Sequence, residues 1–390
     1  MRIGIEAQRL FRPGKHGMEK VAVELIKNLQ IIDKDNEYFI FVKPNHDKSC
    51  ITSTENFHIV EIPSGIYPIW EQYKLAKIAN AYKCDLLHCT SNTAPLFGKI
   101  PLVITLHDII YMEHSLKDLL FSNASTYQKF GNLYRRLIVP FVVKRCQRII
   151  TVSNYERENI TFFFKLKDNR IQTIYNGVNE RYNTQISEEA LTIFEANYKL
   201  PMYYILHISN KDPRKNTKRV LLAYKSFIKA TGAKYKLVML GVNDDNLKIM
   251  LAEVKALDLY KNIVLIGYVP DEDLPTIYNL AALFLFPSLR EGFGIPIIEA
   301  MACSVPVITS NTSSMPEIAG DAAHLINPNK TEEITNGIIK ILSDVKYKDE
   351  LIENGLKRYK LFKWESMAYQ VLDVYKQVSK NIKTKKVSFN

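Results

Sequence analysis

The chain has 390 residues, a length typical of two or three domains that bury their cores without metals or disulfides. Its 47% hydrophobic and 24% charged residues exclude a disordered or fibrous protein. The net charge is +11, so phosphates, nucleic acid or an anionic membrane are candidate partners. No uncharged apolar run approaches the ~18 residues of a membrane span, and Glu6 interrupts a possible signal-peptide core. We expect a multidomain cytoplasmic protein.

Short apolar runs typical of strands alternate with helical patterns from the first residue. In the first half, strands are expected at residues 1–5, 38–42, 85–88, 101–106, 149–152 and 171–175, and helices at 19–30 and 72–81. Ser153 and Glu156 have the spacing of a capping box that opens another helix. This alternation predicts a parallel sheet whose ligands bind at the carboxyl ends of the strands.

A polar stretch at residues 179–189 without apolar periodicity marks the expected linker. A second series of strands follows at residues 203–208, 236–240, 263–266, 283–286, 305–308 and 323–326, and a last helix at 364–378. Two α/β halves therefore share the chain. Neither contains a P-loop or a dinucleotide-binding fingerprint. The five cysteines lack zinc-type pairing and are interpreted as reduced thiols.

The most informative segment is residues 284–302, where a buried strand meets a glycine-rich turn and then a helix. Gly292 and Gly294 allow backbone amides to approach a ligand, and Pro296 suits the first helical turn. An anion or a row of hydroxyls fits such a helix start. Glu291 lies in the turn and Glu299 about one helical turn further on, so both carboxylates can face one ligand. A single Glu there would more often compensate the helix dipole, but two of them favour a binding site.

Glu291 and Glu299, with Gly-Phe-Gly-Ile-Pro between them, resemble the signature of the family 4 retaining glycosyltransferases of the GT-B fold. The resemblance extends through residues 105–108, 152–153, 174–178, 213–216, 267–269 and 314–320. It implies an α/β protein with two Rossmann-like domains whose parallel sheets face across a cleft. Residues 1–185 would bind the acceptor and 186–365 the nucleotide sugar. The C-terminal helix, 366–390, would return to the first domain.

The resemblance also implies roles for individual residues. Glu291 would bind the hydroxyls of the donor sugar, Glu299 the nucleotide ribose and Lys215 the diphosphate, and His107 would contact the sugar. The other implied donor-binding residues are Gly17, Lys211, Arg214, Tyr268, Gly292, Phe293, Gly294 and Ile295. By itself, His107 at a strand end is more often a structural hydrogen-bonding residue. The loop before Gly17 keeps only part of the family's glycine pair.

Residues 209–216 form a basic loop after a strand, which alone would usually be a solvated turn. Cations there also suit a leaving diphosphate, whose charge grows as the glycosidic bond breaks. Many relatives have an Arg where this chain has Asn210, so either Arg214 or Lys211 is expected to replace it. No Asp-x-Asp motif calls for a metal, and no cofactor is expected beyond the donor itself.

Residues 119–155 contain six Lys or Arg and no Asp or Glu. The segment is either a packed helix with a solvated basic face or, as we hypothesise, a contact with an anionic membrane surface through Lys129 to Arg148. The enzyme would then lie peripherally on the inner face of the cytoplasmic membrane. Charge removal at Arg135 and Arg136 addresses this hypothesis.

The predicted function is transfer of a hexose, with retention, to a carbohydrate or lipid-linked acceptor. The sequence is similar to mannosyltransferase-like members that build surface polysaccharides and lipopolysaccharide, so GDP-mannose is the first choice of donor and a UDP-sugar the second. The family implies a front-face mechanism in which Glu291 is no covalent nucleophile. The alternatives are a nucleotide-sugar epimerase of the same fold and a basic nucleic-acid-binding protein; the two carboxylates disfavour the latter.

Overall fold

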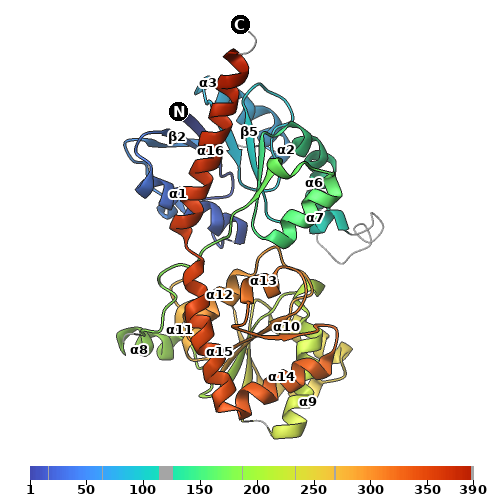
Figure 1. The fold of residues 1–390 in the computed structure, drawn as a ribbon. Helices are drawn as coiled ribbons and strands as arrows, with labels where there is room; N and C mark the ends of the chain where they lie inside the picture. The colour runs from blue at the N-terminus through green and yellow to red at the C-terminus, as the bar shows by residue number, and fades with distance from the viewer. Residues whose placement is uncertain are drawn as a thin grey trace. The chain divides into compact units, whose positions relative to one another are not determined.

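The computed structural model describes residues 1–15, 17–63, 65–113, 126–186, 188–232, 234–267 and 269–387. The chain forms two compact units (Figure 1). The first comprises residues 1–177 together with the C-terminal segment from Trp364, and the second comprises Val178–Lys363. Each unit contains one parallel sheet covered by helices, as the alternation of strand and helix patterns predicts.

The first unit is built on a seven-stranded sheet in the order β3-β2-β1-β4-β5-β6-β7. Its strands are β1 (Arg2–Glu6), β2 (Glu37–Val42), β3 (Phe57–Glu61), β4 (Leu86–Cys89), β5 (Leu102–Leu106), β6 (Arg148–Thr151) and β7 (Ile171–Thr173). Its helices are α1 (Gly17–Ile32), α2 (Tyr67–Ile69), α3 (Ala76–Ala81), α4 (Ile110–Glu113), α6 (Thr126–Arg145), α7 (Asn154–Phe164) and α16 (Trp364–Val387). Ser153 caps α7 by accepting a hydrogen bond from the Glu156 N–H at 3.2 Å.

The two faces of the first sheet carry different helices. Leu102, Ile104 and Leu106 of β5 pack with buried residues of α3 and α6, on one face. On the other face, Thr105 Oγ1 lies 2.8 Å from His88 Nε2, and the His88 Nδ1 atom lies 2.7 Å from the Tyr375 hydroxyl of α16. The helix α16 also packs along α1 (Figure 1). The C-terminal helix therefore completes the core of the first unit.

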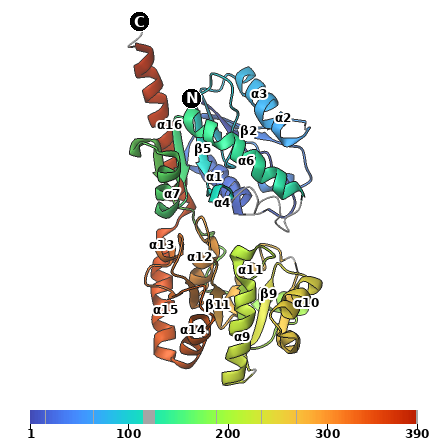
Figure 2. The same ribbon diagram turned by 90° about the vertical axis from the view of Figure 1, so that its right-hand side faces the viewer.

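The second unit has a six-stranded sheet in the order β10-β9-β8-β11-β12-β13. Its strands are β8 (Tyr204–Ile208), β9 (Lys236–Leu240), β10 (Ile263–Ile266), β11 (Leu283–Phe286), β12 (Val307–Ser310) and β13 (His324–Ile326). Its helices are α8 (Glu188–Asn197), α9 (Thr217–Thr231), α10 (Asp244–Glu253), α11 (Leu274–Asn279), α12 (Ile295–Ala302), α13 (Met315–Ala319), α14 (Thr331–Ser343) and α15 (Val345–Arg358). Figure 2 shows α9 and α10 beside β9.

A buried carboxylate joins three segments of the first unit. Glu71 is 0% exposed and lies in a π-helical turn, Trp70–Leu75, between α2 and α3. Its Oε1 atom accepts hydrogen bonds from Tyr67 (2.6 Å) and Thr93 (2.5 Å), and its Oε2 atom accepts from Gln72 (2.7 Å) and Tyr134 of α6 (2.6 Å). These donors compensate the cost of burying a charge, so Glu71 holds the turn, the loop after β4 and α6 together.

A second buried carboxylate, Glu6, ends β1 and is 1% exposed. Burial raises its pKa to about 7, against a hydrogen bond from the Gln8 N–H that lowers it, and the charge of Glu71 raises it further. The Glu6 Oε2 atom accepts no hydrogen bond from the described part of the chain. The folded state therefore favours the protonated acid of Glu6.

This preference predicts a pH-dependent loss of stability that Glu6→Gln removes. The contribution of Glu6 to the free energy of unfolding is complete below its ordinary pKa of 4.5 and is lost as the pH rises through about 7. The variant, neutral throughout, should gain at most about 3 kcal/mol relative to wild type between pH 5 and 8. Denaturant unfolding at both pH values measures the difference, with the exposed Glu55→Gln as control. A constant difference between wild type and Glu6→Gln would contradict the prediction.

Candidate active site

The two segments with the clearest sequence signals meet at one point of the second sheet. The strand order reverses between the neighbours β8 and β11, and such a reversal opens a crevice at the carboxyl ends of the strands where α/β proteins bind ligands. The basic loop follows β8 and the loop of Glu291 follows β11. The Leu289 N–H donates to the Arg214 carbonyl at 2.7 Å, which ties the two loops together.

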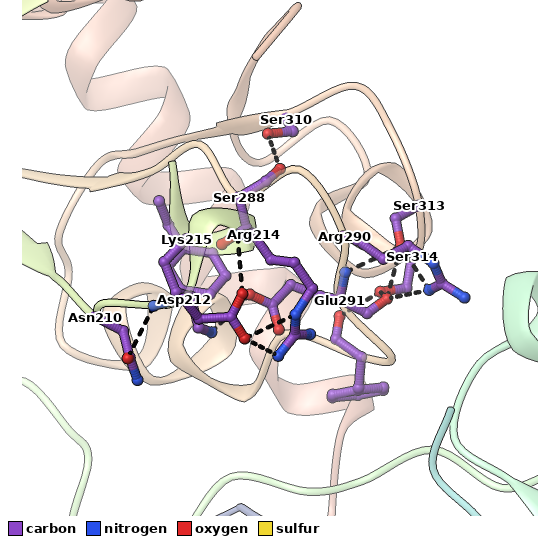
Figure 3. Close-up of polar contacts among 12 residues, drawn as sticks. Asn210, Asp212, Arg214, Lys215, Ser288, Arg290, Glu291, Ser310, Ser313 and Ser314 are labelled. Atoms are coloured by element: carbon purple, nitrogen blue, oxygen red, sulfur yellow. Dashed lines mark hydrogen bonds and ion pairs between the residues drawn. The ribbon is translucent and has the colours of Figure 1, made fainter. Parts of the chain in front are cut away.

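Lys215 of the loop after β8 and Glu291 of the loop after β11 form an ion pair (Figure 3). The Lys215 Nζ atom is 2.6 Å from Glu291 Oε1, and the side chains are 20% and 14% exposed, respectively. The ammonium group also lies 5.0 Å from the centre of the Phe286 ring. Partial burial strengthens such a pair relative to one at the surface. The site therefore presents a cation and a carboxylate side by side to any ligand that enters.

Serine side chains hold the loop of Glu291 in place (Figure 3). Ser313 donates to the Glu291 carbonyl at 2.6 Å and accepts from the Glu291 N–H at 3.1 Å. Ser314 donates to the carbonyls of Glu291 (3.0 Å) and Phe293 (2.9 Å). Neither serine was predicted from the sequence as a site residue, although Ser314 begins one of the segments that carry the family resemblance.

The start of α12 has the geometry of an anion site. Gly294 precedes the helix with φ +108°, a conformation that other residues rarely adopt, and a Cβ atom there would lie 3.0 Å from the Ile297 side chain. Pro296 occupies the first turn. The first N–H groups of a helix have no partner within it and carry a partial positive charge. The backbone amides of Gly292 to Ile295 thus lie next to Glu291, between β11 and the first turn of α12.

Two tyrosines surround Glu299, which lies in α12. The Tyr278 hydroxyl of α11 donates to Glu299 Oε2 at 3.1 Å. Tyr182 packs edge-on against Tyr278 at 5.9 Å between ring centres. Burial raises the pKa of both phenols, and the negative charge of Glu299 raises it further. Both tyrosines therefore stay protonated and help to position the carboxylate. Neither tyrosine could be identified from the sequence, because both are far from Glu299 along the chain.

The cations of the basic loop differ in their contacts. Arg214 donates to Asp212 Oδ2 from Nη2 (2.6 Å) and from Nε (2.9 Å), so its charge is shared with a carboxylate (Figure 3). Lys211 is exposed to solvent, and Asn210 accepts the Asp212 N–H at 3.2 Å. The loop thus offers Lys215 and Lys211 as the cations that Asp212 does not hold.

Two further predicted residues, His107 and Gly17, belong to the first unit. His107 follows β5 of the first unit, is 7% exposed, and has its Nε2 atom 2.9 Å from the Thr90 carbonyl. Burial lowers its pKa, and because a carbonyl can only accept, Nε2 carries the proton of a neutral ring. Gly17 begins α1, after a loop in which Lys15 pairs with Asp47. Tyr268 lies outside the described residues.

Comparison with known proteins places both units in one family. Residues 16–182 match the family model Glycosyltransferase Family 4, and residues 192–358 match Glycosyl transferases group 1. The chain is 35% identical over 230 residues to O-antigen chain mannosyltransferase B of Escherichia coli, an alignment that covers 58% of this chain and 60% of that protein. It is 27% identical over 282 residues to O-antigen chain mannosyltransferase RfbU of Salmonella typhimurium, covering 71% and 69%. The chain thus spans less than two thirds of the first relative.

Solved structures show the same fold. Anabaena Alr3699/HepE in complex with UDP-glucose superimposes with a TM-score of 0.75 at 17% identity, covering 97% of this chain and 100% of that one. WaaG, a glycosyltransferase involved in lipopolysaccharide biosynthesis, gives 0.71 at 14% identity, covering 96% and 99%. With a family model matching within each unit and this shared architecture, the chain belongs to the family 4, group 1 glycosyltransferases of the GT-B fold.

Proposed function

We propose that the protein is a retaining hexosyltransferase that uses a nucleotide diphosphate sugar. The observation that carries the proposal is the Lys215–Glu291 pair, 2.6 Å apart at the reversal point of the second sheet, beside the amide-rich start of α12. A nucleotide sugar needs a cation for its diphosphate and an acceptor of hydrogen bonds for its sugar hydroxyls. Lys215 and Glu291 supply these two functions at neighbouring positions.

We assign the other roles by the same chemistry. Glu299 would hold the ribose hydroxyls, and the amides of Gly292 to Ile295 would contact sugar and phosphate. Lys211 would assist Lys215 at the diphosphate in place of the Arg missing at position 210, since Arg214 is bound to Asp212. We propose that His107, whose buried ring is neutral, contacts the donor sugar. These roles need no metal at the diphosphate.

The proposed reaction breaks the bond between the anomeric carbon and the diphosphate oxygen. Negative charge then develops on the leaving oxygens, where Lys215 and the helix amides stabilise it. The acceptor hydroxyl forms the new bond on the same face of the sugar, and its proton passes to the leaving diphosphate oxygen. This sequence retains the anomeric configuration and forms no covalent enzyme intermediate.

Mannose is the sugar that we favour, with GDP as the nucleotide. Two of the relatives are O-antigen chain mannosyltransferases of Escherichia coli and Salmonella typhimurium, which supports an acceptor in surface polysaccharide or glycolipid synthesis. A UDP-sugar is the second choice, supported by the neighbour bound to UDP-glucose. Among the described residues, no helix has the length and apolar character of a membrane span. We propose a peripheral position on the inner membrane surface, through α6.

A thermal-shift screen with GDP, UDP and ADP tests the nucleotide. We expect GDP to raise the melting temperature most; failure of every nucleoside diphosphate to stabilise the protein would contradict the donor site. NMR of the product from GDP-mannose and an oligosaccharide acceptor then reports the anomeric configuration. An inverted product would overturn the retaining mechanism, and a changed sugar in the absence of acceptor would indicate an epimerase.

A further inference from the structure

The helix α6 has two apolar faces, of which only one is covered. Val139, Val142 and Val143 are buried in the core of the first unit. On the opposite side, an outward stripe follows the spacing three, four and four along the helix. It consists of Phe130 (52% exposed), Leu133 (39%), Leu137 (59%) and Phe141 (59%). Four large apolar side chains in one exposed row are unusual on a surface that meets only water.

Two other segments of the first unit continue this apolar surface. Gln72 joins them to α6, because its side chain contacts the Tyr134 hydroxyl (2.8 Å), the Ala94 carbonyl (3.0 Å) and the Leu96 N–H (2.8 Å). α2 and α6 lie side by side in Figures 1 and 2. The exposed apolar residues of these segments are Ile66 (65%), Ile69 (50%), Tyr73 (63%) and Phe97 (77%). We call residues 66–81, 90–100 and 126–145 the three-segment face.

The three-segment face is strongly basic. It contains eight cations, namely Lys74, Lys77, Lys99, Lys129, Arg135, Arg136, Lys144 and Arg145. Its single acidic residue is Glu71, which is 0% exposed, whereas the whole chain has 41 acidic residues among 390. Two boundaries limit the face. Arg148 donates to Gln377 of α16 at 3.0 Å and so points elsewhere, and α4, which packs against α6, ends in the exposed Glu113.

We propose that the three-segment face is a docking surface for an anionic lipid bilayer. Its cations would contact lipid phosphates while the outward stripe of α6 enters the headgroup region. The proposed surface is larger than a single basic helix, because the hydrogen bonds of Glu71 hold the three segments together. A second copy of the chain would oppose cation to cation, and nucleic acid would leave Leu133 and Leu137 of the stripe without an apolar partner. Docking on the bilayer would give the enzyme access to a lipid-linked acceptor, and only this purpose rests on the proposed function.

Vesicle flotation of the full chain tests the proposal directly. Vesicles that contain phosphatidylglycerol should bind the protein, and phosphatidylcholine vesicles should not. Each neutralised cation at Lys129 or Lys144 should lower binding about fivefold, and Leu137→Ser with Phe141→Ser should lower it by at least about tenfold. The matched controls in the second unit are Val345→Ser with Leu361→Ser, which replace two exposed apolar residues, and Lys346→Gln.

The outcomes separate this proposal from the catalytic one. Equal binding to both vesicle types, unchanged binding in the stripe variants, or an equal loss in the controls would overturn the docking surface. A stripe variant that changes only the oligomeric state would indicate a contact between copies and would also overturn it. Thermal stabilisation by GDP is measured without lipid, so loss of that response contradicts the donor site and leaves the lipid result intact.

Discussion

The variant Glu291→Gln is expected to lower kcat for sugar transfer by about 10²–10³-fold without weakening the binding of GDP. The Glu291 carboxylate lies 2.6 Å from Lys215 and, in our assignment, accepts hydrogen bonds from the sugar as it leaves the diphosphate. Gln has the same shape but no charge, so the loop held by Ser313 should stay in place. Lys215 loses its counter-charge in the variant and remains available to the diphosphate.

Isothermal titration with GDP and steady-state kinetics with GDP-mannose separate the two effects. Lys215→Met should show the opposite pattern, with the affinity for GDP lowered at least about tenfold because a charge-assisted contact is lost. Glu332→Gln, an exposed carboxylate at the start of α14, serves as the matched control and should change neither quantity. If Glu291→Gln lowered GDP affinity and kcat in proportion, Glu291 would belong to nucleotide binding rather than to the sugar.

Much of the strand pattern could be predicted from the sequence because buried parallel strands are short, continuous apolar runs between polar loops. The strands at 236–240, 263–266 and 283–286 have the predicted bounds. β3 (Phe57–Glu61) was missed, since its alternating residues at an edge of the sheet resemble a loop. The helix predicted at 72–81 is π-helical up to Leu75 and α-helical only from Ala76. The buried Glu71 of the π-helical turn contacts Thr93 and Tyr134 on two distant segments, which the local sequence does not reveal.

The site was predictable where local sequence determines the geometry. Gly294 requires a positive φ, Pro296 suits a helix start, and both are visible in the turn that carries Glu291. The pairing of Lys215 with Glu291 could not be predicted from the sequence, because it depends on β8 and β11 being neighbours in the sheet. Tyr182, Tyr278 and Ser313 were missed because their contacts, with the Glu299 side chain or with the Glu291 backbone, join residues that are far apart in the chain.

The variant Glu299→Ala is expected to lose the thermal stabilisation by GDP and UDP while keeping the fold. We assign the Glu299 carboxylate to the two ribose hydroxyls, and two hydrogen bonds to a charged group are worth about 3 kcal/mol, or about 10²-fold in Kd. Both nucleotides carry the same ribose, so both should be affected equally. Tyr278→Phe removes only the hydroxyl that positions Glu299 and should weaken binding less. Unchanged GDP and UDP shifts in Glu299→Ala would overturn the ribose assignment.

A ligand that lacks the ribose hydroxyls distinguishes direct contact from a structural effect. Wild-type protein should bind 2′,3′-dideoxy-GDP about 10²-fold more weakly than GDP, and Glu299→Ala should no longer discriminate between the two ligands. If the variant still preferred GDP by the wild-type ratio, another group would hold the ribose and Glu299 would act only through its tyrosine neighbours. Such a double comparison of ligand and side chain cancels any general loosening of α12, because loosening weakens both ligands alike.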